Sequence, residues 1–318
     1  MDLPKRVVIS EEGPREGFQI EKGPIETADK IALIDALSEC GLSRIQVGSF
    51  VNAKHVPGWA DAEAVFEGFK PRAGIEYSAV WFNGAGLQRA LAFKEKLRLE
   101  GFISLSASEP FAIRNLNRDR AGQIEAMTEY VRVHRDAGLP VGKIIVMAAF
   151  GCNFAGDIST AMVVETVADA LAIACDAGVE IHDVTLADSM GWATPIRVAF
   201  AVGAVRDRWP KLKVALHLHD TRGQGIACAY EGLRVGVTSF DTAVGGLGGC
   251  PFAGQPGAPG NIATEELALL CEEMGISTGL DVPALIEVGR LAERIVGHSL
   301  PSAALRSGTL ASFRRNTV

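Results

Sequence analysis

Three absences limit what this chain can be. The six cysteines form no CxxC pair and no disulfide framework, so we expect reduced thiols that serve mainly as small apolar side chains. No segment reaches the roughly 18 consecutive apolar residues of a membrane span. Positive charge is also in deficit, since the net charge is −7 and a surface that binds nucleic acid or anionic membranes needs a basic field. We therefore expect neither a nucleic-acid nor a membrane partner.

The two ends of the sequence carry no recognisable targeting signal. The first ten residues, MDLPKRVVIS, place charges where a secretory signal peptide needs an apolar stretch. The last five, RRNTV, differ from a peroxisomal signal. With reduced thiols, these features predict a soluble cytoplasmic protein.

Short apolar, β-branched runs alternate with longer amphipathic runs along the chain, which is typical of βα units around a parallel sheet. Eight such units favour an α/β fold of the (β/α)8 or TIM-barrel type over an open doubly wound sheet. The 48% apolar content suffices for its large core. The predicted strands are residues 6–12, 44–49, 75–81, 99–107, 142–150, 180–187, 213–220 and 239–246.

Three helices are marked by their end signals. Residues 27–41 begin at a threonine cap and stop at glycine, and residues 194–209 carry proline at the first helical position. Residues 282–297 predict an extra C-terminal helix after the eighth unit, followed by an irregular tail. No low-complexity linker divides the chain, so we predict a single domain over 1–318, with the barrel at about 5–280 and a helical extension at about 281–318.

The strongest chemical signal is HLHD at 217–220, which ends the seventh predicted strand. Side chains two apart on a strand face the same way, so His217 and His219 can offer two nitrogen ligands to one metal ion. Chemistry in TIM barrels takes place at the carboxyl ends of the strands, where Glu16 and Asn261 would also lie. This mixed nitrogen and oxygen set suits Mg²⁺ or Mn²⁺, whereas zinc more often recruits a thiolate. Taken alone, each histidine could be a packed residue and Asn261 a turn residue.

Arg15 and Asp188 each leave two alternatives open. A fixed guanidinium beside a metal can bind the oxygen that becomes negative in an enolate, but Arg15 could equally form an ion pair that caps a helix or joins strands. Asp188, in LADSMG, is either a further catalytic carboxylate or the cap of the helix that begins near Thr194.

The segment 245–261 is rich in glycine and contains three prolines, which suggests a mobile lid at the rim of the barrel. Cys250 lies in it, and we expect this thiol to be exposed, unlike the cysteines of the helices. It is either functional or an incidental turn residue. Phosphate binding is the weaker interpretation, because the segment lacks the Lys-Ser/Thr of a Walker loop.

Together, these motifs resemble the 3-hydroxy-3-methylglutaryl-CoA lyase family, a group of TIM-barrel metallolyases. Within that superfamily, the combination of GGLGGCP and HxHDTxGQ is specific to the lyases. The resemblance runs over nearly the whole chain, through GPREGFQIEK (13–22), GLSRIQVGSFV (41–51), SASE (106–109), FGC (150–152), LADSMG (186–191), HLHDTRGQ (217–224), GGLGGCPFA (245–253) and GNIATEE (260–266).

The resemblance implies a retro-Claisen cleavage of an acyl-CoA thioester to acetyl-CoA and a keto acid. A base takes the proton of the tertiary hydroxyl group, and the C–C bond then breaks to give a ketone and an acetyl-CoA enolate. The implied metal ligands are Glu16, His217, His219 and Asn261. Arg15 would stabilise the enolate, and the implied proton carriers are Asp188 and His217, assisted by Cys250.

Four basic residues at the expected barrel mouth are candidates for binding the CoA phosphates, although each is otherwise an ordinary solvated charge: Lys22, Lys54, Arg114 and Arg118. A homodimer is compatible with the extra C-terminal helix, since barrels with such helices often dimerise.

Two residues depart from the family pattern, which has aspartate where Glu16 stands and glutamate where Gln46 stands. The first change lengthens a ligand by one methylene group, and the second removes a charge that would orient Arg15. The longer Glu16 could supply part of the charge missing at Gln46, which predicts a lyase retuned for another 3-hydroxyacyl-CoA. The alternatives are a Claisen-type synthase, a 4-hydroxy-2-oxo acid aldolase, and a barrel that binds metal or acyl-CoA without turnover.

Overall fold

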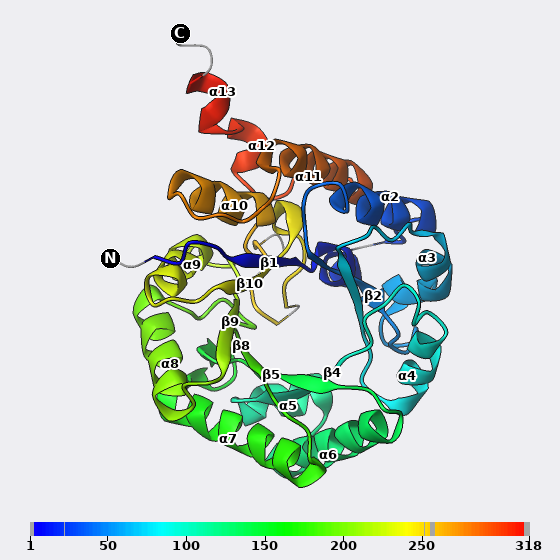
Figure 1. The fold of residues 1–318 in the computed structure, drawn as a ribbon, viewed down its shortest axis with the longest axis vertical. Coiled ribbons are helices and arrows are strands. Elements are labelled where there is room, and N and C mark those ends of the chain that lie inside the picture. The colour runs from blue at the N-terminus through cyan, green and yellow to red at the C-terminus, as the bar shows by residue number, and fades with distance from the viewer. Residues whose placement is uncertain (1–2, 22, 251, 255–257, 315–318) are drawn as a thin grey trace.

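Eight parallel strands form one sheet that curls into a barrel (Figure 1). The computed structural model describes residues 3–21, 23–250, 252–254 and 258–314. The order of the strands around the sheet is β3-β2-β1-β10-β9-β8-β5-β4. Their bounds are β1 (Val8–Glu11), β2 (Arg44–Ser49), β3 (Glu76–Val80), β4 (Gly101–Ser106), β5 (Val141–Met147), β8 (Asp183–Ala187), β9 (Lys213–His217) and β10 (Ser239–Thr242).

The topology confirms the predicted TIM barrel, because the last strand, β10, pairs in parallel with the first, β1. Each predicted strand is present, and β5 is the one that begins before its predicted range. Within the described residues no ladder joins β3 to β4; there the backbone N–H of Arg98 donates to the Tyr77 carbonyl at 2.8 Å. A short antiparallel hairpin, β6 (Gly151–Cys152) with β7 (Gly156–Asp157), follows β5.

Helices surround the sheet and cover its outer face (Figure 1). The apolar core fills the layer between them, as on β2, where Ile45 and Val47 are fully buried. The helices and helical turns are η1 (Gly13–Gly17), α1 (Phe18–Ile20), α2 (Thr27–Leu37), η2 (Pro57–Trp59), α3 (Ala62–Gly68), α4 (Gly84–Leu91), α5 (Glu109–Leu116), α6 (Arg120–Asp136), α7 (Thr160–Ala177), α8 (Pro195–Arg208), α9 (Gly225–Arg234), η3 (Val244–Gly246), α10 (Thr264–Glu273), α11 (Val282–Val296), α12 (Ala304–Ser307) and α13 (Leu310–Arg314). None of these helices is both long and apolar enough to cross a bilayer.

The predicted helices correspond to α2, α8 and α11, but the threonine cap of the first is wrong. Glu26 occupies the N-cap position of α2, and Thr27 is its first residue. The Thr27 hydroxyl donates instead to Asp61 Oδ2 at 2.6 Å. Asp61 directly precedes α3, so this hydrogen bond links α2 to α3. The proline at the start of α8 is at the first helical position, as predicted.

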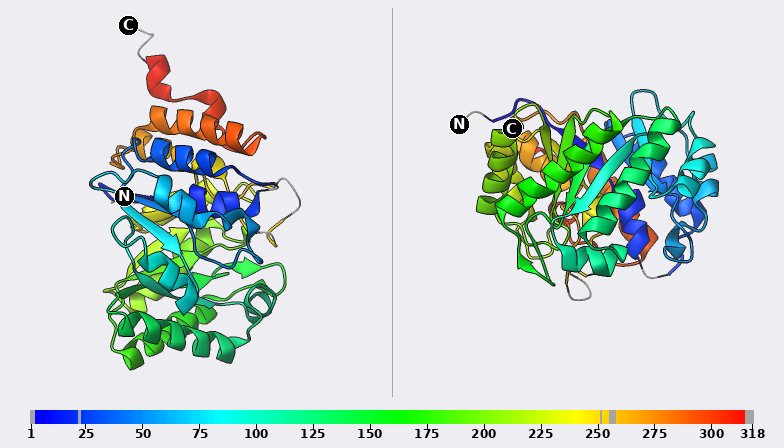
Figure 2. Two further views of the ribbon diagram at one scale, coloured as in Figure 1. Left: turned by 90° about the vertical axis from the view of Figure 1, so that its right-hand side faces the viewer. Right: turned by 90° about the horizontal axis from the view of Figure 1, so that it is seen from below.

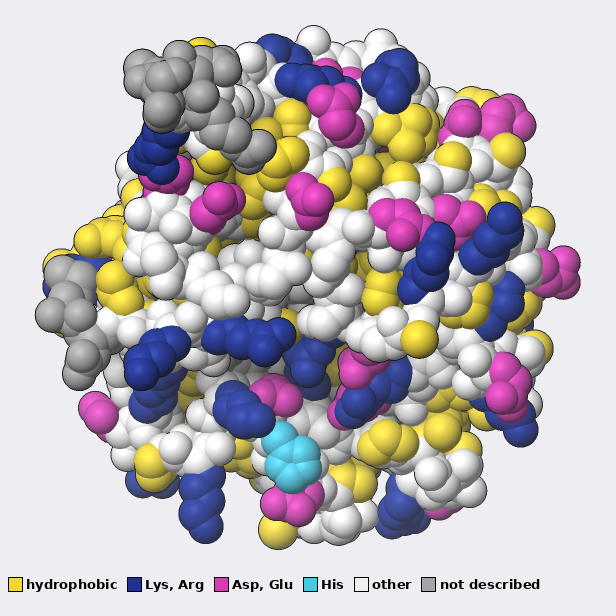
Figure 3. All heavy atoms as spheres, turned by 45° about the horizontal axis from the view of Figure 1, so that its top comes forward, with side chains coloured by type: hydrophobic (Ala, Val, Ile, Leu, Met, Phe, Trp, Pro, Cys, Tyr) yellow, Lys and Arg dark blue, Asp and Glu magenta, His cyan; other side chains and the backbone are white. Residues whose placement is uncertain are grey.

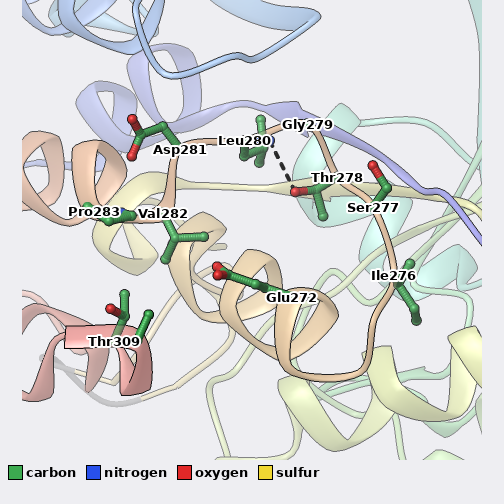
Figure 4. Close-up of a pocket in the computed structure, with 11 residues that line it drawn as sticks. Glu272, Ile276, Ser277, Thr278, Gly279, Leu280, Asp281, Val282, Pro283 and Thr309 are labelled. Atoms are coloured by element: carbon green, nitrogen blue, oxygen red, sulfur yellow. Dashed lines mark hydrogen bonds between the residues drawn. The ribbon is translucent and has the colours of Figure 1, made fainter. Parts of the chain in front are cut away.

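The chain beyond the barrel is more regular than predicted. After α11 it forms the short helices α12 and α13, and α13 projects away from the barrel (Figure 2). A cavity of about 350 Å³ lies between α10, the segment 276–283 and Thr309 (Figure 4). Ser277 pairs with Arg6, just before β1, so this cavity lies at the amino ends of the strands. None of the predicted site residues lines it.

Candidate active site

Polar residues from widely separated parts of the sequence meet at the carboxyl ends of β1, β9 and β10. Glu16 lies in η1, the single π-helical turn after β1, and His217 is the last residue of β9. His219 and Asn261 pair through an isolated antiparallel bridge. The start of this turn packs tightly: a Cβ at Gly13 would lie 2.5 Å from Glu11 Oε1, so a larger residue would have to displace that carboxylate.

Three of the predicted metal ligands are brought together. Glu16 Oε1 lies 3.4 Å from His219 Nε2, and Glu16 Oε2 lies 3.8 Å from His217 Nε2. The two histidine Nε2 atoms are 3.2 Å apart. One ligand atom from each residue lies within 4.8 Å of the others, close enough for a single ion to contact all three.

Asn261 completes this set and supplies the test of whether a cation fits. Its Nδ2 donates to Glu16 Oε1 at 3.0 Å and to the Leu247 carbonyl at 2.9 Å. Its Oδ1 is buried and has no hydrogen-bond partner among the residues that the structure describes. A buried carbonyl oxygen without a partner is costly, whereas a hard cation would satisfy it. Two imidazoles, a carboxylate and this oxygen therefore fit a divalent metal ion.

The acidic side chains of the cluster also favour a positive charge at its centre. Burial raises the pKa of Glu16, but His217, Arg15 and His219 together hold it well below its usual value. Burial lowers the pKa of His217, yet the nearby carboxylates of Glu16 and Asp241 raise it to about 9. Without a metal, the imidazolium of His217 balances the acidic groups, and a metal ion would have to displace that proton.

The backbone fixes His219 in a suitable orientation. Its Nδ1 lies 3.1 Å from the Ser189 carbonyl, which can only accept a hydrogen bond. The proton therefore sits on Nδ1, and the unprotonated Nε2 faces Glu16. Ser189 follows Asp188, which is buried just beyond β8.

Arg15 is held on three sides. Its Nε donates to Gln46 Oε1, its Nη2 to Glu12 Oε2 at 2.5 Å, and its Nη1 lies 3.3 Å from Glu16 Oε2. The arginine therefore both forms ion pairs with its own turn and lies beside the metal cluster, so the two alternatives left open by the sequence coexist.

A second group of charges, which the sequence analysis missed, lies behind His217. Its Nδ1 is 3.7 Å from Asp241 Oδ2 and 3.9 Å from Glu12 Oε2. Lys143 Nζ, from β5, lies 3.8 Å from the same oxygen of Asp241. The signal that could have found these residues is charge within or directly after a strand, since such groups face the barrel interior only when paired.

Asp188 caps a turn. Its Oδ1 accepts the Trp192 N–H at 2.7 Å, in the turn that precedes α8. Asp188 therefore caps this turn and not α8, whose N-cap residue is Thr194. Burial raises the pKa of Asp188 above its ordinary value, and His219 acts in the opposite direction. The group is therefore a carboxylate that takes up a proton more readily than usual.

The glycine-rich segment packs directly on the cluster. The Gly249 N–H donates to Glu16 Oε1 at 3.2 Å. Gly248 has φ +87°, and a Cβ there would lie 2.6 Å from Asn261 Nδ2 and 3.0 Å from Glu16 Cγ, so only glycine fits. Residues 251 and 255–257 of the predicted lid lie outside the described residues.

The predicted exposure pattern of the cysteines is wrong. Cys175, in helix α7, is exposed, whereas Cys250 is half-buried. Cys250 packs against an apolar cluster that includes Phe111 and Met190, which covers part of it from solvent. That burial raises the pKa of the Cys250 thiol to about 11.

Three of the four predicted phosphate-binding cations are described, and Lys22 lies outside the described residues. Lys54 and Arg118 are exposed, and the Arg114 guanidinium stacks 4.4 Å from the centre of the Phe154 ring. On the face shown in Figure 3, basic and acidic side chains are interspersed, so an anion there would meet local cations rather than a broad basic field.

A parallel eight-stranded barrel with a histidine and carboxylate cluster at the carboxyl ends of its strands defines a TIM barrel with a candidate metal centre on its catalytic face. Comparison with known proteins is more specific: the HMGL-like family model matches residues 6–292, and the chain belongs to this family. The resemblance noted in the sequence is thereby confirmed, and the chain is a carbon–carbon lyase.

Its relatives share nearly its full length. A 3-hydroxy-3-isohexenylglutaryl-CoA/hydroxymethylglutaryl-CoA lyase of Pseudomonas aeruginosa is 36% identical over 96% of this chain and 98% of its own. The mitochondrial hydroxymethylglutaryl-CoA lyase of Homo sapiens is 38% identical over 90% of this chain and 85% of its own. A solved HMG-CoA lyase structure from Acinetobacter baumannii, in complex with coenzyme A and 3-methylmalate, has a TM-score of 0.85 and 37% identity, covering 98% of this chain and 97% of that one.

Proposed function

We propose that this lyase cleaves 3-hydroxy-3-methylglutaryl-CoA, or a related 3-hydroxyacyl-CoA, to acetyl-CoA and a keto acid, which is acetoacetate for the parent substrate. The observation that carries the proposal is the convergence of Glu16, His217 and His219 with the unpaired Oδ1 of Asn261. A fixed arginine lies 3.3 Å from that cluster, where an enolate oxygen would need stabilisation. Relatives with this activity in their names support it.

We propose that Glu16, His217, His219 and Asn261 hold Mg²⁺ or Mn²⁺. Such an ion acidifies a bound hydroxyl group and neutralises developing negative charge. Arg15 is preorganised by three partners, so it can stabilise the enolate oxygen without first reorienting.

The proton released from the hydroxyl group has to reach the carbon of the enolate, which gives acetyl-CoA and balances the reaction. Asp188 and His217 are the proposed carriers. Burial raises the pKa of Asp188, so this carboxylate takes up a proton more readily than usual. His217 would bind the ion through Nε2 and could still hold a proton on Nδ1, which faces Asp241 at 3.7 Å. Cys250, with a pKa of about 11, stays a thiol at neutral pH, so its proposed role is that of a proton donor.

The proposed substrate is a CoA thioester, and the proposed phosphate contacts are Lys22, Lys54, Arg114 and Arg118. The Acinetobacter baumannii structure that contains coenzyme A supports this substrate class. The single domain with its bounds, the homodimer and the cytoplasmic location stay predictions.

Incubating the purified protein with Mn²⁺ or Mg²⁺ and a panel of 3-hydroxyacyl-CoAs, while acetyl-CoA is quantified by mass spectrometry, tests the proposal. We expect release for at least one member and none after removal of the metal by a chelator. Acyl-CoA binding without release would identify a non-catalytic barrel. Turnover of a 4-hydroxy-2-oxo acid without CoA would identify an aldolase, and condensation onto a 2-oxo acid a synthase.

A further inference from the structure

The arginine of the active site has one close carboxylate partner that the family resemblance does not account for. Arg15 Nη2 lies 2.5 Å from Glu12 Oε2, whereas Arg15 Nη1 lies 3.3 Å from Glu16 Oε2. The third contact, with Gln46, is made by a neutral amide. The shortest ionic contact of Arg15 within the described residues therefore comes from Glu12.

Glu12 is held rigidly enough to orient another side chain. Its backbone N–H donates to the Thr242 carbonyl at 2.8 Å, and its carbonyl accepts the N–H groups of Arg15 at 3.1 Å and Glu16 at 2.8 Å. Its side chain is buried, with a relative exposure of 9%. The Arg15 side chain thus folds back onto the residue that begins its own turn, and little freedom is left for either group.

Glu16 is a poor candidate for the same role. Its Oε1 accepts from Asn261 Nδ2 and Gly249 N and also faces His219, and its Oε2 faces His217 as well as Arg15. Both oxygens of Glu16 face proposed metal ligands, so a bound ion would draw on the lone pairs that Arg15 uses and weaken that ion pair. The compensation for Gln46 that the sequence analysis assigned to Glu16 is better assigned to Glu12.

A second metal ion between Glu12, His217 and Asp241 is the competing interpretation, since their ligand atoms also lie within 4.8 Å of one another. The oxygen of Glu12 that faces His217 is the one bound by Arg15, and the oxygen of Asp241 that faces His217 is the one nearest Lys143. Two permanent cations already neutralise these carboxylates, so a further cation would be repelled.

We propose that Glu12 is a positioning residue that orients Arg15 toward the reacting oxygen. The carboxylate that pairs with this arginine then lies directly after the first strand, while position 46 on the second strand is neutral. The inference rests on the proposed lyase function. It implies that one carboxylate at either position suffices. A carboxylate at both positions would add a fourth acidic group to Glu12, Glu16 and Asp241, and two carboxylates besides Glu16 would then compete for Arg15.

Relocating the charge tests this directly. The variants are E12Q, Q46E, the double variant E12Q/Q46E, and E129Q as the matched control, because Glu129 is an exposed helical glutamate that is also paired with an arginine, Arg132. We measure kcat and KM with Mn²⁺ on the substrate that the wild type cleaves. We expect E12Q to lower kcat about 100-fold with KM within about threefold, as for loss of a preorganised charge.

The double variant should regain at least about tenfold of the kcat lost in E12Q, because a glutamate at 46 can pair with Arg15 bidentately. Q46E alone should be slower than the wild type, and E129Q unchanged. Wild-type kcat in E12Q, or a double variant no faster than E12Q, would overturn the inference. So would a loss of Mn²⁺ binding in E12Q of the size seen on removing a metal ligand, measured by electron paramagnetic resonance.

A readout that needs no turnover separates failure of this inference from failure of the proposed function. The Tm shifts of E12Q and R15Q should be strongly non-additive in the double variant E12Q/R15Q, since each single change leaves a buried charge without its partner. Additive shifts would show that the two groups do not depend on each other. If E12Q does not fold, E12D takes its place, because shortening the side chain withdraws the carboxylate from Arg15.

Discussion

Two buried glutamates five residues apart, Glu11 and Glu16, show how differently one segment can use the same side chain. Glu11 Oε1 accepts the N–H groups of Gly13 at 2.7 Å and Val244 at 2.9 Å, and its Oε2 accepts the Thr264 hydroxyl at 2.5 Å. Together, these three contacts join the turn after β1, the start of the glycine-rich segment and the start of α10.

Glu16, in contrast, faces two histidines and the amide of Asn261, whose oxygen has no hydrogen-bond partner among the described residues. The polar groups around Glu11 are paired with one another, whereas the group beside Glu16 includes one buried oxygen that a ligand could satisfy. The difference teaches that burial of a carboxylate does not identify an active site, whereas an unsatisfied partner beside it does.

The largest effect is expected from Glu16→Gln. Loss of a charged ligand should lower kcat by at least about 1,000-fold and Mn²⁺ affinity by at least about 100-fold. Tm without metal should fall, because the Glu16 carboxylate pairs with His217 and Arg15 and its removal leaves these charges without that partner. Kinetics, Mn²⁺ titration and thermal unfolding measure the three quantities, and retained Mn²⁺ affinity would contradict the proposed ligand set.

Asp241→Asn should have the next largest effect, because it weakens the group that supports His217 from the side opposite the metal. Mn²⁺ affinity should fall by about 10- to 100-fold, as is usual when the hydrogen-bond partner of a metal-bound histidine is changed. Isothermal titration with Mn²⁺ gives this number. An unchanged affinity would mean that Asp241 forms an ion pair with Lys143 but does not support His217 as a metal ligand.

Glu11→Gln tests the other glutamate, Glu11, and should change how the free energy of unfolding depends on pH. Burial raises the pKa of Glu11 to about 7, from 4.5. A raised folded-state pKa contributes stability that is full below the unfolded value and lost as pH rises through the folded value. The wild type should therefore lose a few kcal/mol of unfolding free energy from this group between pH 4.5 and 7.

In Glu11→Gln that slope should be shallower, because the titrating group is gone, although Glu265, whose pKa burial also raises to about 7, keeps part of it. Urea unfolding at several pH values measures the slope, and Mn²⁺ affinity should stay within about threefold since no proposed ligand is changed. A slope equal to that of the wild type would rule out Glu11 as its source.

The smallest effect on metal binding, at most about tenfold per pH unit, is expected from pH alone. Because the pKa of His217 is raised to about 9 without metal, one proton must leave as the ion binds. Mn²⁺ affinity should rise with pH up to about 9 and approach a plateau above it. Calorimetry in buffers of different ionisation enthalpy counts the protons released, and a count of zero at pH 7 would contradict the raised pKa.

The barrel and the metal-type cluster could be predicted from the sequence because both depend on local pattern. Alternating apolar runs mark the strands, and the spacing of His217 and His219 places them on one face whatever surrounds them. Glu16 and Asn261 could be added because the fold brings all strand ends to one rim.

Glu12, Asp241 and Lys143 could not be found in this way. Lys143 reaches Asp241 across the barrel interior, and that contact depends on the stagger of strands that are far apart in the sequence. The exposure of Cys250 was mispredicted for a similar reason, since the apolar residues that cover it come from α5 and the segment after β8.

The order of the strands divides the ring into two parts. The proposed ligands and Arg15 all follow the neighbouring strands β1, β9 and β10, while β3 and β4 meet without a ladder on the far side. A change in the residues at that seam would therefore leave in place the three strands from which the proposed ligands come.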